Sequence, residues 1–196
     1  AGRALLGATE EYDLILSLAP APTTAAGNRV FPRESFASAL AWVADRGALV
    51  VALGSHSLYR GERFRERNGA VHAALAAVAG PVTVLPGDRS LLVAPGPRAA
   101  PTADPGVLAF RLRRSGVSSP TFPPERFALL FPPADAEAAR RELEETRVPP
   151  NRDGRPGAFL TGLLLWDEET KAGVARLLES RPLGVARRPP RRPPPR

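Results

Sequence analysis

Side chains that could carry chemistry are few in this sequence, and one group of them follows an apolar run. Residues 48–53 read as a buried strand, and Ser55, His56 and Tyr59 come directly after it. In open α/β sheets, ligands bind at the carboxyl ends of the strands. These three side chains could therefore line the rim of a pocket. They could equally form a solvated loop, because spacing alone does not define a Ser-His-acid geometry.

A second polar group precedes an apolar helical pattern near the other end of the chain. Asn151 and Asp153 could contact a ligand there, or they could cap the helix, as Asn and Asp often do. Gly154 and Gly157 lie beside them but do not follow a strand, and they form no dinucleotide-binding fingerprint. Both interpretations stay open for Asn151 and Asp153.

Several kinds of chemistry are excluded by what the chain lacks. It contains no Cys, which rules out disulfides, thiolate metal sites and thiol nucleophiles. It has two His, His56 and His72, so a multi-histidine metal site is not expected. His72 stands next to Val71 in a helical pattern and is predicted to be an ordinary helix residue.

The 196 residues suffice for one domain with a tail, and the charge is uneven along them. Six of the 27 basic residues lie in residues 181–196, which contain no acid, so the rest of the chain is close to neutral. We predict that this Arg/Pro-rich tail is disordered. Phosphate backbones or anionic surfaces are its alternative partners, although nucleic-acid binding is not expected. No apolar run approaches the length of a membrane span, and we expect a cytoplasmic location.

The first half of the chain alternates strand and helix patterns. Residues 12–18 and 48–53 read as buried strands, and residues 33–45 as a helix that Gly47 ends. Another helix runs to about residue 79, with a mixed-charge first turn that is predicted to face solvent. The charged residues of that turn are Glu62, Arg63, Arg65, Glu66 and Arg67. Strands that alternate with helices indicate a parallel α/β sheet.

The pattern then changes to a hairpin followed by helices. Residues 82–85 and 91–94 flank a five-residue loop with a glycine, which is too short for a crossover and indicates antiparallel strands. We predict one sheet from the four strands, as in the methyltransferase-type variant of the doubly wound, Rossmann-like fold. Residues 95–105 read as a linker. The helical patterns beyond it cover residues 107–114, 124–131, 135–147, 159–166 and 174–178.

Taken in order, these motifs resemble the spermidine synthase family, and most closely its bacterial members that are fused to membrane helices. Those proteins share a YDL strand, a P-D-P-like loop, an N-R pair and an R-E-F helix start at this spacing. The matching segments here are Tyr12-Asp13-Leu14, Pro20-Ala21-Pro22, Asn28-Arg29, Arg33-Glu34-Ser35-Phe36, Gly87-Asp88-Arg89, Pro150-Asn151-Arg152-Asp153 and the Leu-rich stretch from Phe159 to Trp166. The likeness extends over about residues 3 to 180 and adds Asn28 to the candidate pocket rim.

The resemblance also shows what is missing. Family members bind decarboxylated S-adenosylmethionine, or S-adenosylmethionine, on a glycine-rich loop and an acidic residue, both carried by strands that would precede this sequence. Their catalytic carboxylates stand in a D-x-x-D-P segment at the end of the strand that matches residues 12–18. Leu18 and Ala21 occupy those positions here, and neither can accept a proton. We therefore expect no catalytic residue and no cofactor site in this chain alone.

Three functions follow as hypotheses. The first is an inactive fragment, with residues 1–95 as the second half of the synthase-like sheet, residues 96–180 as its helical extension and residues 181–196 as the tail. The second is half of an adenosyl-cofactor-dependent transferase, completed by a preceding polypeptide. The third is an α/β binding module with a basic tail. Because the strand at residues 12–18 would lie on an open edge, self-association through that edge is also expected.

Overall fold

The fold was analysed in a computed structural model that describes residues 11–54, 61–87, 89–170 and 173. Residues 55–60 and 174–196 lie outside it, so the predictions for Ser55, His56, Tyr59, the last helical turns and the tail fall on undescribed residues. The described part contains four strands and seven helices. These are β1 (Tyr12–Ser17), α2 (Ala25–Asn28), α3 (Arg33–Leu40), β2 (Val43–Gly54), α4 (Glu62–Ala79), β3 (Thr83–Leu85), β4 (Arg89–Pro95), α5 (Pro105–Arg114), α6 (Arg126–Leu130), α7 (Pro133–Glu145) and α8 (Gly157–Thr170).

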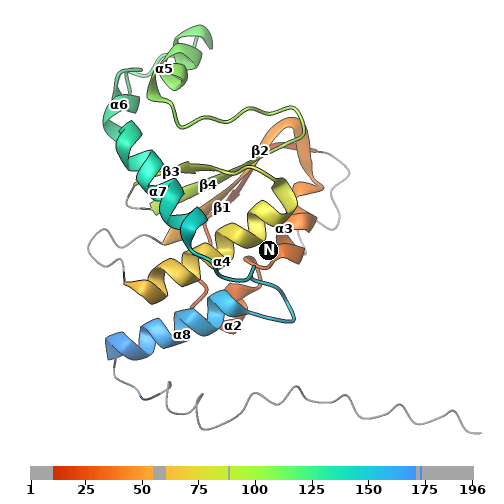
Figure 1. The fold of residues 1–196 in the computed structure, drawn as a ribbon. Helices are drawn as coiled ribbons and strands as arrows, with labels where there is room; N and C mark the ends of the chain where they lie inside the picture. Colours follow the sequence, from red (N-terminus) through yellow and green to blue (C-terminus); the bar gives the residue numbers. More distant parts are fainter. Residues whose placement is uncertain (1–10, 55–60, 88, 171–172, 174–196) are drawn as a thin grey trace, which may run out of the picture.

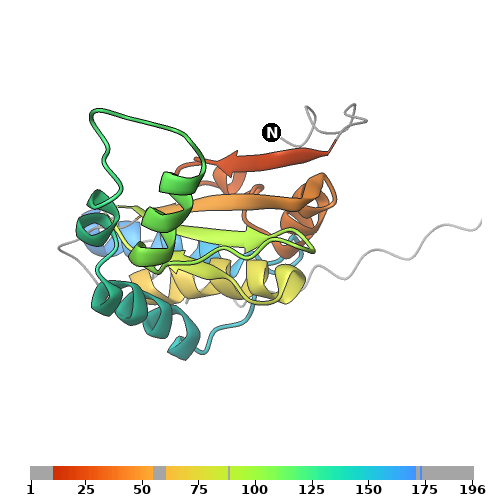
Figure 2. The same cartoon turned by 90° about the horizontal axis from the view of Figure 1, so that it is seen from above.

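The four strands form one mixed sheet in the order β1-β2-β4-β3. β1 pairs with β2 in parallel, with Leu14 opposite Ala48 and Leu16 opposite Val50. β4 runs antiparallel to both β2 and β3 and lies between them. This confirms the prediction of a single α/β sheet that ends in a hairpin strand (Figures 1 and 2).

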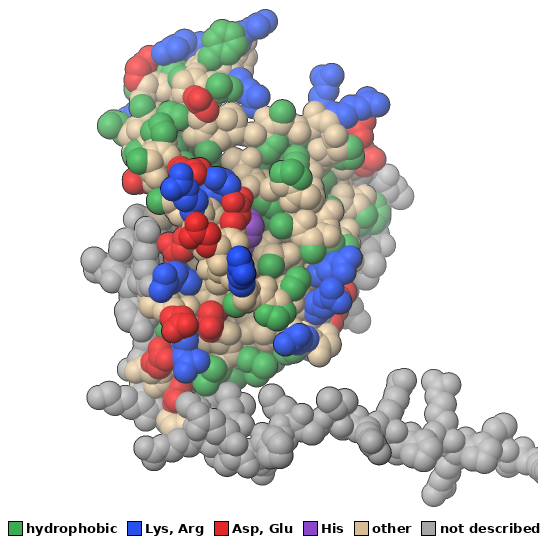
Figure 3. All heavy atoms as spheres, viewed as in Figure 1, with side chains coloured by type: hydrophobic (Ala, Val, Ile, Leu, Met, Phe, Trp, Pro, Cys, Tyr) green, Lys and Arg blue, Asp and Glu red, His purple; other side chains and the backbone are tan. Residues whose placement is uncertain are grey.

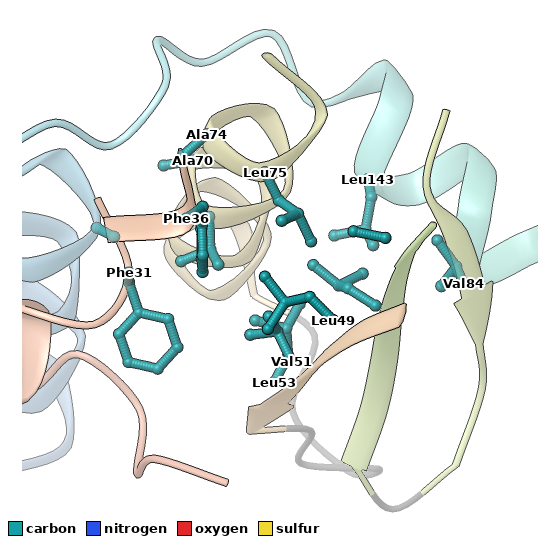
Figure 4. Packing of buried hydrophobic residues seen from close by; sticks show 14 of the residues in the cluster. Phe31, Phe36, Leu49, Val51, Leu53, Ala70, Ala74, Leu75, Val84 and Leu143 are labelled. Carbon is teal, nitrogen blue, oxygen red and sulfur yellow. The ribbon is translucent and has the colours of Figure 1, made fainter. Parts of the chain in front are cut away.

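The core lies between one face of the sheet and α4. Leu49, Val51 and Leu53 alternate along β2 and point toward α4, where Leu75 faces them (Figure 4). Val71 of α4 belongs to the same buried cluster. Phe31 and Phe36 close the core on the α3 side, while Val84 and Leu143 belong to its β3–α7 side. Because α8 packs on the opposite side of α4, α4 is a middle layer between the sheet and α8 (Figure 1).

The opposite face of the sheet is covered unevenly. Residues 96–104 run past its β3 side, where the Thr83 hydroxyl donates to the carbonyl of Pro101 at 3.4 Å. On β1, by contrast, Leu14 and Leu16 are 59% and 51% exposed. Since β1 is also the edge strand, the described chain leaves both an apolar stripe and a strand edge without cover. None of the described helices is both long and apolar enough to cross a bilayer.

The predicted helix at residues 33–45 is wrong in its second half. α3 ends at Leu40, and β2 already begins at Val43, so that Gly47 lies within a strand. Backbone pairing explains the difference: Tyr12 N donates to Trp42 O at 2.7 Å, and Gly96 N donates to Gly47 O at 2.8 Å. A Cβ at Gly47 would lie 2.8 Å from the carbonyl oxygens of Tyr12 and Asp13. The glycine thus permits a close approach of β1 and ends no helix.

Candidate functional site

The loop after β1 is the place where the family resemblance puts the catalytic carboxylates. Leu18 is 57% exposed there, Ala21 is half-buried and Pro22 is buried. The nearest acids along the chain are Asp13, which lies near the start of β1, and Glu34 in the first turn of α3. The loop therefore offers an apolar side chain and backbone groups, but no proton acceptor with a pKa suited to an amine.

Glu34 is engaged elsewhere. Its carboxylate accepts a hydrogen bond from the backbone N–H of Asp153 at 3.1 Å. Hydrogen bonds from its own backbone N–H and from Asp153, aided by the charges of Arg152 and Arg33, lower the pKa of Glu34. It is thus an ionised carboxylate that ties α3 to the loop before α8, and its place is the helix N-terminus, where negative charge is favoured.

Asn28 and Asn151, two residues predicted for the pocket rim, meet in the structure across 123 positions of sequence. The Asn151 side-chain amide donates to the Asn28 carbonyl oxygen at 3.0 Å, and Asn151 Oδ1 accepts from Ala158 N at 3.1 Å. Ala158 lies in the first turn of α8, so Asn151 pairs a backbone N–H at the start of that helix, although it is not the residue that directly precedes the helix. Both Asn side chains are buried, and the polar atoms of Asn151 serve the fold.

Asp153, the third of these residues within the described part, is exposed. Its backbone N–H binds Glu34, as described above, and its carboxylate is open to solvent. Asp153 lies two residues beyond the buried Asn151, but at the surface. The structure thus brings Asn28 and Asn151 together and places Asp153 near them at the surface, and none of the three lines either of the two hollows described below.

At the carboxyl end of β2, the structure places a buried arginine that the sequence did not indicate. Arg67 of α4 is 3% exposed, which corrects the prediction that the charged turn at its position faces solvent. Its guanidinium carbon lies 4.8 Å from the centroid of the Phe64 ring, and Nε donates to Asn68 Oδ1 at 3.3 Å. Asn68 in turn donates to the carbonyl oxygen of Gly54 at 3.4 Å.

The burial of Arg67 follows from the layer formed by α8. Gly162 of α8 fits so closely that a Cβ there would lie 2.8 Å from Pro22 O and 3.7 Å from Arg67 Cδ. Phe64, Asn68 and Val71 recur at helical spacing on the buried side of α4, a pattern that could have signalled that its first two turns are packed. A buried guanidinium at the end of a parallel strand can hold a carboxylate or phosphate, but here it is engaged by Asn68 and Phe64.

Two surface hollows of about 440 Å³ each border the first turns of α4. The first is lined by Glu62, Arg63, Glu66 and Glu168, and Arg63 forms an ion pair with Glu168 of α8. The second lies between α4 and the end of α7 and is also bordered by Glu62 and Glu66, together with Glu142 and Glu145. The remaining members of the predicted charged turn line these hollows.

The residues present do not fit an adenosyl cofactor. No two glycines in the sequence are separated by a single residue, so a G-x-G loop for a cofactor is missing. The segments that follow the parallel strands, residues 18–33 and 54–61, contain no acid that could hold a ribose. Within the described residues, no group of three or more His, Asp or Glu is placed to bind a metal ion.

No model of a known protein family matches the sequence, and no curated protein matches it either. The likeness to spermidine synthases thus rests on the sequence motifs.

Proposed function

We propose that the chain is the second half of a spermidine-synthase-like domain of the methyltransferase type, and that this half is catalytically inactive by itself. The order of the sheet supports the proposal. The hairpin strand β4 lies antiparallel between β2 and β3, which is how the methyltransferase-type variant of the doubly wound fold closes its sheet. The motifs that resemble the family lie at the elements expected of them: Tyr12 begins β1 and Arg33 begins α3.

The observation that carries the proposal is the loop after β1. Aminopropyl transfer requires a carboxylate that accepts a proton from the attacking amine, and further carboxylates that hold the polyamine. Leu18 is an exposed aliphatic side chain at one of these positions, and Ala21 is a methyl group at the other. Loss of a positioned general base alone costs roughly 10²–10⁴-fold in rate.

The proposal is tested by isothermal titration of the purified chain with decarboxylated S-adenosylmethionine, beside a coupled transferase assay with putrescine. We expect neither saturable binding nor turnover, while an active spermidine synthase in the same buffers shows both. Saturable binding in the micromolar range would contradict the cofactor part of the proposal. Turnover that depends on Asp13 would contradict the catalytic part.

A second candidate function is favoured by the exposed stripe on β1. Leu14 and Leu16 point away from the core on the edge strand, and Leu18 continues the stripe. A strand paired with the free edge of β1, together with a helix across this face, would cover both features at once. A preceding polypeptide with such a unit could also carry the cofactor loop, and the composite would be an adenosyl-dependent transferase with an acceptor other than a polyamine.

This second candidate is tested by mixing the chain with the polypeptide encoded directly upstream of Ala1. Binding of S-adenosylmethionine by the mixture, with loss of binding in the Leu14→Lys/Leu16→Lys variant, would support it. The variant Leu129→Lys changes an even more exposed leucine on another element and serves as the control. If the chain instead forms dimers or larger species by itself, and Leu16→Lys abolishes them, the edge is covered by a second copy.

A further inference from the structure

A second group of exposed apolar side chains lies far from β1, on the segment that contains α5 and α6. We call residues 105–131 the α5–α6 arm. Leu129 is 80% exposed and Phe110 is 55% exposed, and Val107, Val117 and Leu130 are exposed as well. Large hydrophobic side chains that gather on one projecting segment indicate an interaction surface, whereas single ones need no explanation.

Helix α5 presents a face that mixes apolar and basic side chains. Val107, Phe110, Arg111 and Arg114 recur at i, i+3, i+4 and i+7 and are all exposed. The Arg114 guanidinium carbon lies 5.7 Å from the centroid of the Phe110 ring. The other side of the helix packs inward through the buried Ala109. The outer face of α5 therefore presents a phenyl ring beside the guanidinium of Arg114.

The arm as a whole is basic. It contains four arginines and one acid, Glu125. Arg113 donates to Glu125 at 2.7 Å and so links α5 to α6, and Arg111 donates to the carbonyl of Ala100 at 2.9 Å. The pairing of Glu125 with Arg113 leaves the positive charge of Arg111, Arg114 and Arg126 without an acid within the arm.

The arm projects from the body of the molecule. α5 packs mainly against α6, and the sheet separates it from α4 and α8 (Figures 1 and 2). Figure 3 shows hydrophobic side chains exposed between Lys and Arg side chains at this end of the molecule. Asp104 caps α5 by accepting hydrogen bonds from Gly106 N at 2.8 Å and Val107 N at 3.0 Å. This local cap stabilises the start of the helix without contacts to the rest of the molecule.

The combination of charge and apolar surface selects one class of partner. A second copy of the arm would bring like charges together. Nucleic acid would attract the arginines but would leave the exposed aliphatic side chains of Leu129, Leu130 and Val117 in water. An anionic lipid surface takes both, because arginines meet its phosphates while aromatic and aliphatic side chains enter the acyl boundary. We propose that the α5–α6 arm binds the surface of anionic lipid bilayers through Phe110, Leu129 and the neighbouring arginines.

The test is co-sedimentation of the full chain with vesicles of phosphatidylcholine, with and without phosphatidylglycerol. The arginines of residues 181–196 could attract anionic vesicles themselves, so the comparison is repeated in a variant in which they are replaced by Gln. In both backgrounds we expect binding to the anionic vesicles, weak binding to pure phosphatidylcholine, and a loss of roughly tenfold or more in Phe110→Ser/Leu129→Ser. The Arg111→Gln/Arg114→Gln variant should bind anionic vesicles less tightly, and the binding that remains should depend less on salt.

The matched control is Leu14→Ser/Leu16→Ser, which removes two exposed leucines from β1 and should bind vesicles as the parent does. Equal binding by Phe110→Ser/Leu129→Ser and its parent would overturn the proposal. So would the absence of vesicle binding once the tail arginines are replaced. Dimerisation or RNA binding that requires Phe110 and Leu129, without vesicle binding, would assign the surface to a second copy or to nucleic acid and would equally overturn it.

Discussion

At the scale of single residues, Asn151 joins segments that are far apart in the sequence. Its side chain binds Asn28 at the end of α2 and Ala158 at the start of α8. Its backbone N–H donates to Ala70 O in α4, and its carbonyl accepts from Arg33 N at the start of α3. A buried amide with a partner for both side-chain atoms specifies one arrangement of these helices, because any other would leave polar groups unpaired.

Replacement of Asn151 by Ala should therefore destabilise the fold strongly. The change leaves Asn28 Oδ1 and Ala158 N buried without these partners, and each such group costs about 1–3 kcal/mol. We expect the free energy of unfolding to fall by about 2–4 kcal/mol in urea denaturation. Asp153→Ala, two residues away and exposed, should change it by less than about 0.5 kcal/mol. Equal effects of the two substitutions would refute the role given to Asn151.

His72 should make stability depend on pH. Burial in α4 lowers the pKa of its imidazole, and the carboxylate of Glu144 opposes this only in part. The contribution of His72 to the free energy of unfolding is thus fully present above the unfolded pKa of about 6.5. It is lost as the pH falls below that value, because the unfolded chain then binds the proton more readily than the folded chain. The free energy of unfolding in urea should fall as the pH is lowered from about 7.5 to about 5, a range that lies above the main titration of carboxylates. The His72→Gln variant should show a smaller fall, and an identical slope would contradict the argument.

The polar residues illustrate what a sequence can and cannot reveal at this scale. The sequence predicts Asn28 and Asn151 as residues of a pocket rim, but only the fold shows that their side chains bind each other. Since a run of charges is usually exposed, the local sequence predicts a solvated position for Arg67 as for its charged neighbours. Its burial depends on α8, which returns to cover α4 after about ninety further residues. No local pattern contains that contact.

At the scale of elements, the hairpin and the strand pattern were predictable, while the α3–β2 junction was not. The hairpin follows from a short loop between two apolar runs, which is local information. In contrast, Val43 occupies the i+7 position of a helical pattern and is buried as expected, but it reaches the core from a strand. Pairing with Tyr12 and with residues 96–98 decides the conformation there, and tertiary contacts override helix propensity.

The packing of α8 gives a prediction with a matched control. Gly162 and Gly157 both lie in α8, and Ala is the better helix former at either position. A Cβ at Gly162 would stand 2.8 Å from the backbone oxygen of Pro22, whereas a Cβ at Gly157 meets nothing within 4 Å. Gly162→Ala should thus lower the free energy of unfolding by about 1–3 kcal/mol, and Gly157→Ala should leave it unchanged or raise it slightly. A stabilising Gly162→Ala would show that α8 does not press on the loop after β1.

At the scale of the whole molecule, helices cover one face of the sheet, whereas part of the other face is exposed among the described residues. α4, α7 and α8 build layers on one face of the sheet, while the β1 half of the other face presents leucines to solvent. Parallel strands such as β1 and β2 are normally covered on both faces of their sheet. The covered side holds a complete core with satisfied polar groups. If the proposed function holds, a strand that carries the cofactor loop would pair with this uncovered edge.

The proposed function predicts the outcome of placing carboxylates in the loop after β1. In the variant Leu18→Asp/Ala21→Asp, both acids stand in the loop where the family has them, and the exposed Leu18 position tolerates the charge. A positioned base returns at most roughly 10²–10⁴-fold of a rate enhancement that is about 10⁶-fold or larger in enzymes. The remaining factor requires a bound cofactor, and the loops after β1 and β2 contain neither an acid for a ribose nor a G-x-G turn. Because Ala21 is half-buried, Asp there should lower the melting temperature somewhat. We expect the folded variant to show no heat of binding with decarboxylated S-adenosylmethionine and to give no turnover with putrescine in the coupled assay. If the variant alone transfers an aminopropyl group, the carboxylates were the sole deficit, and the assignment of the cofactor site to the uncovered edge of β1 is wrong.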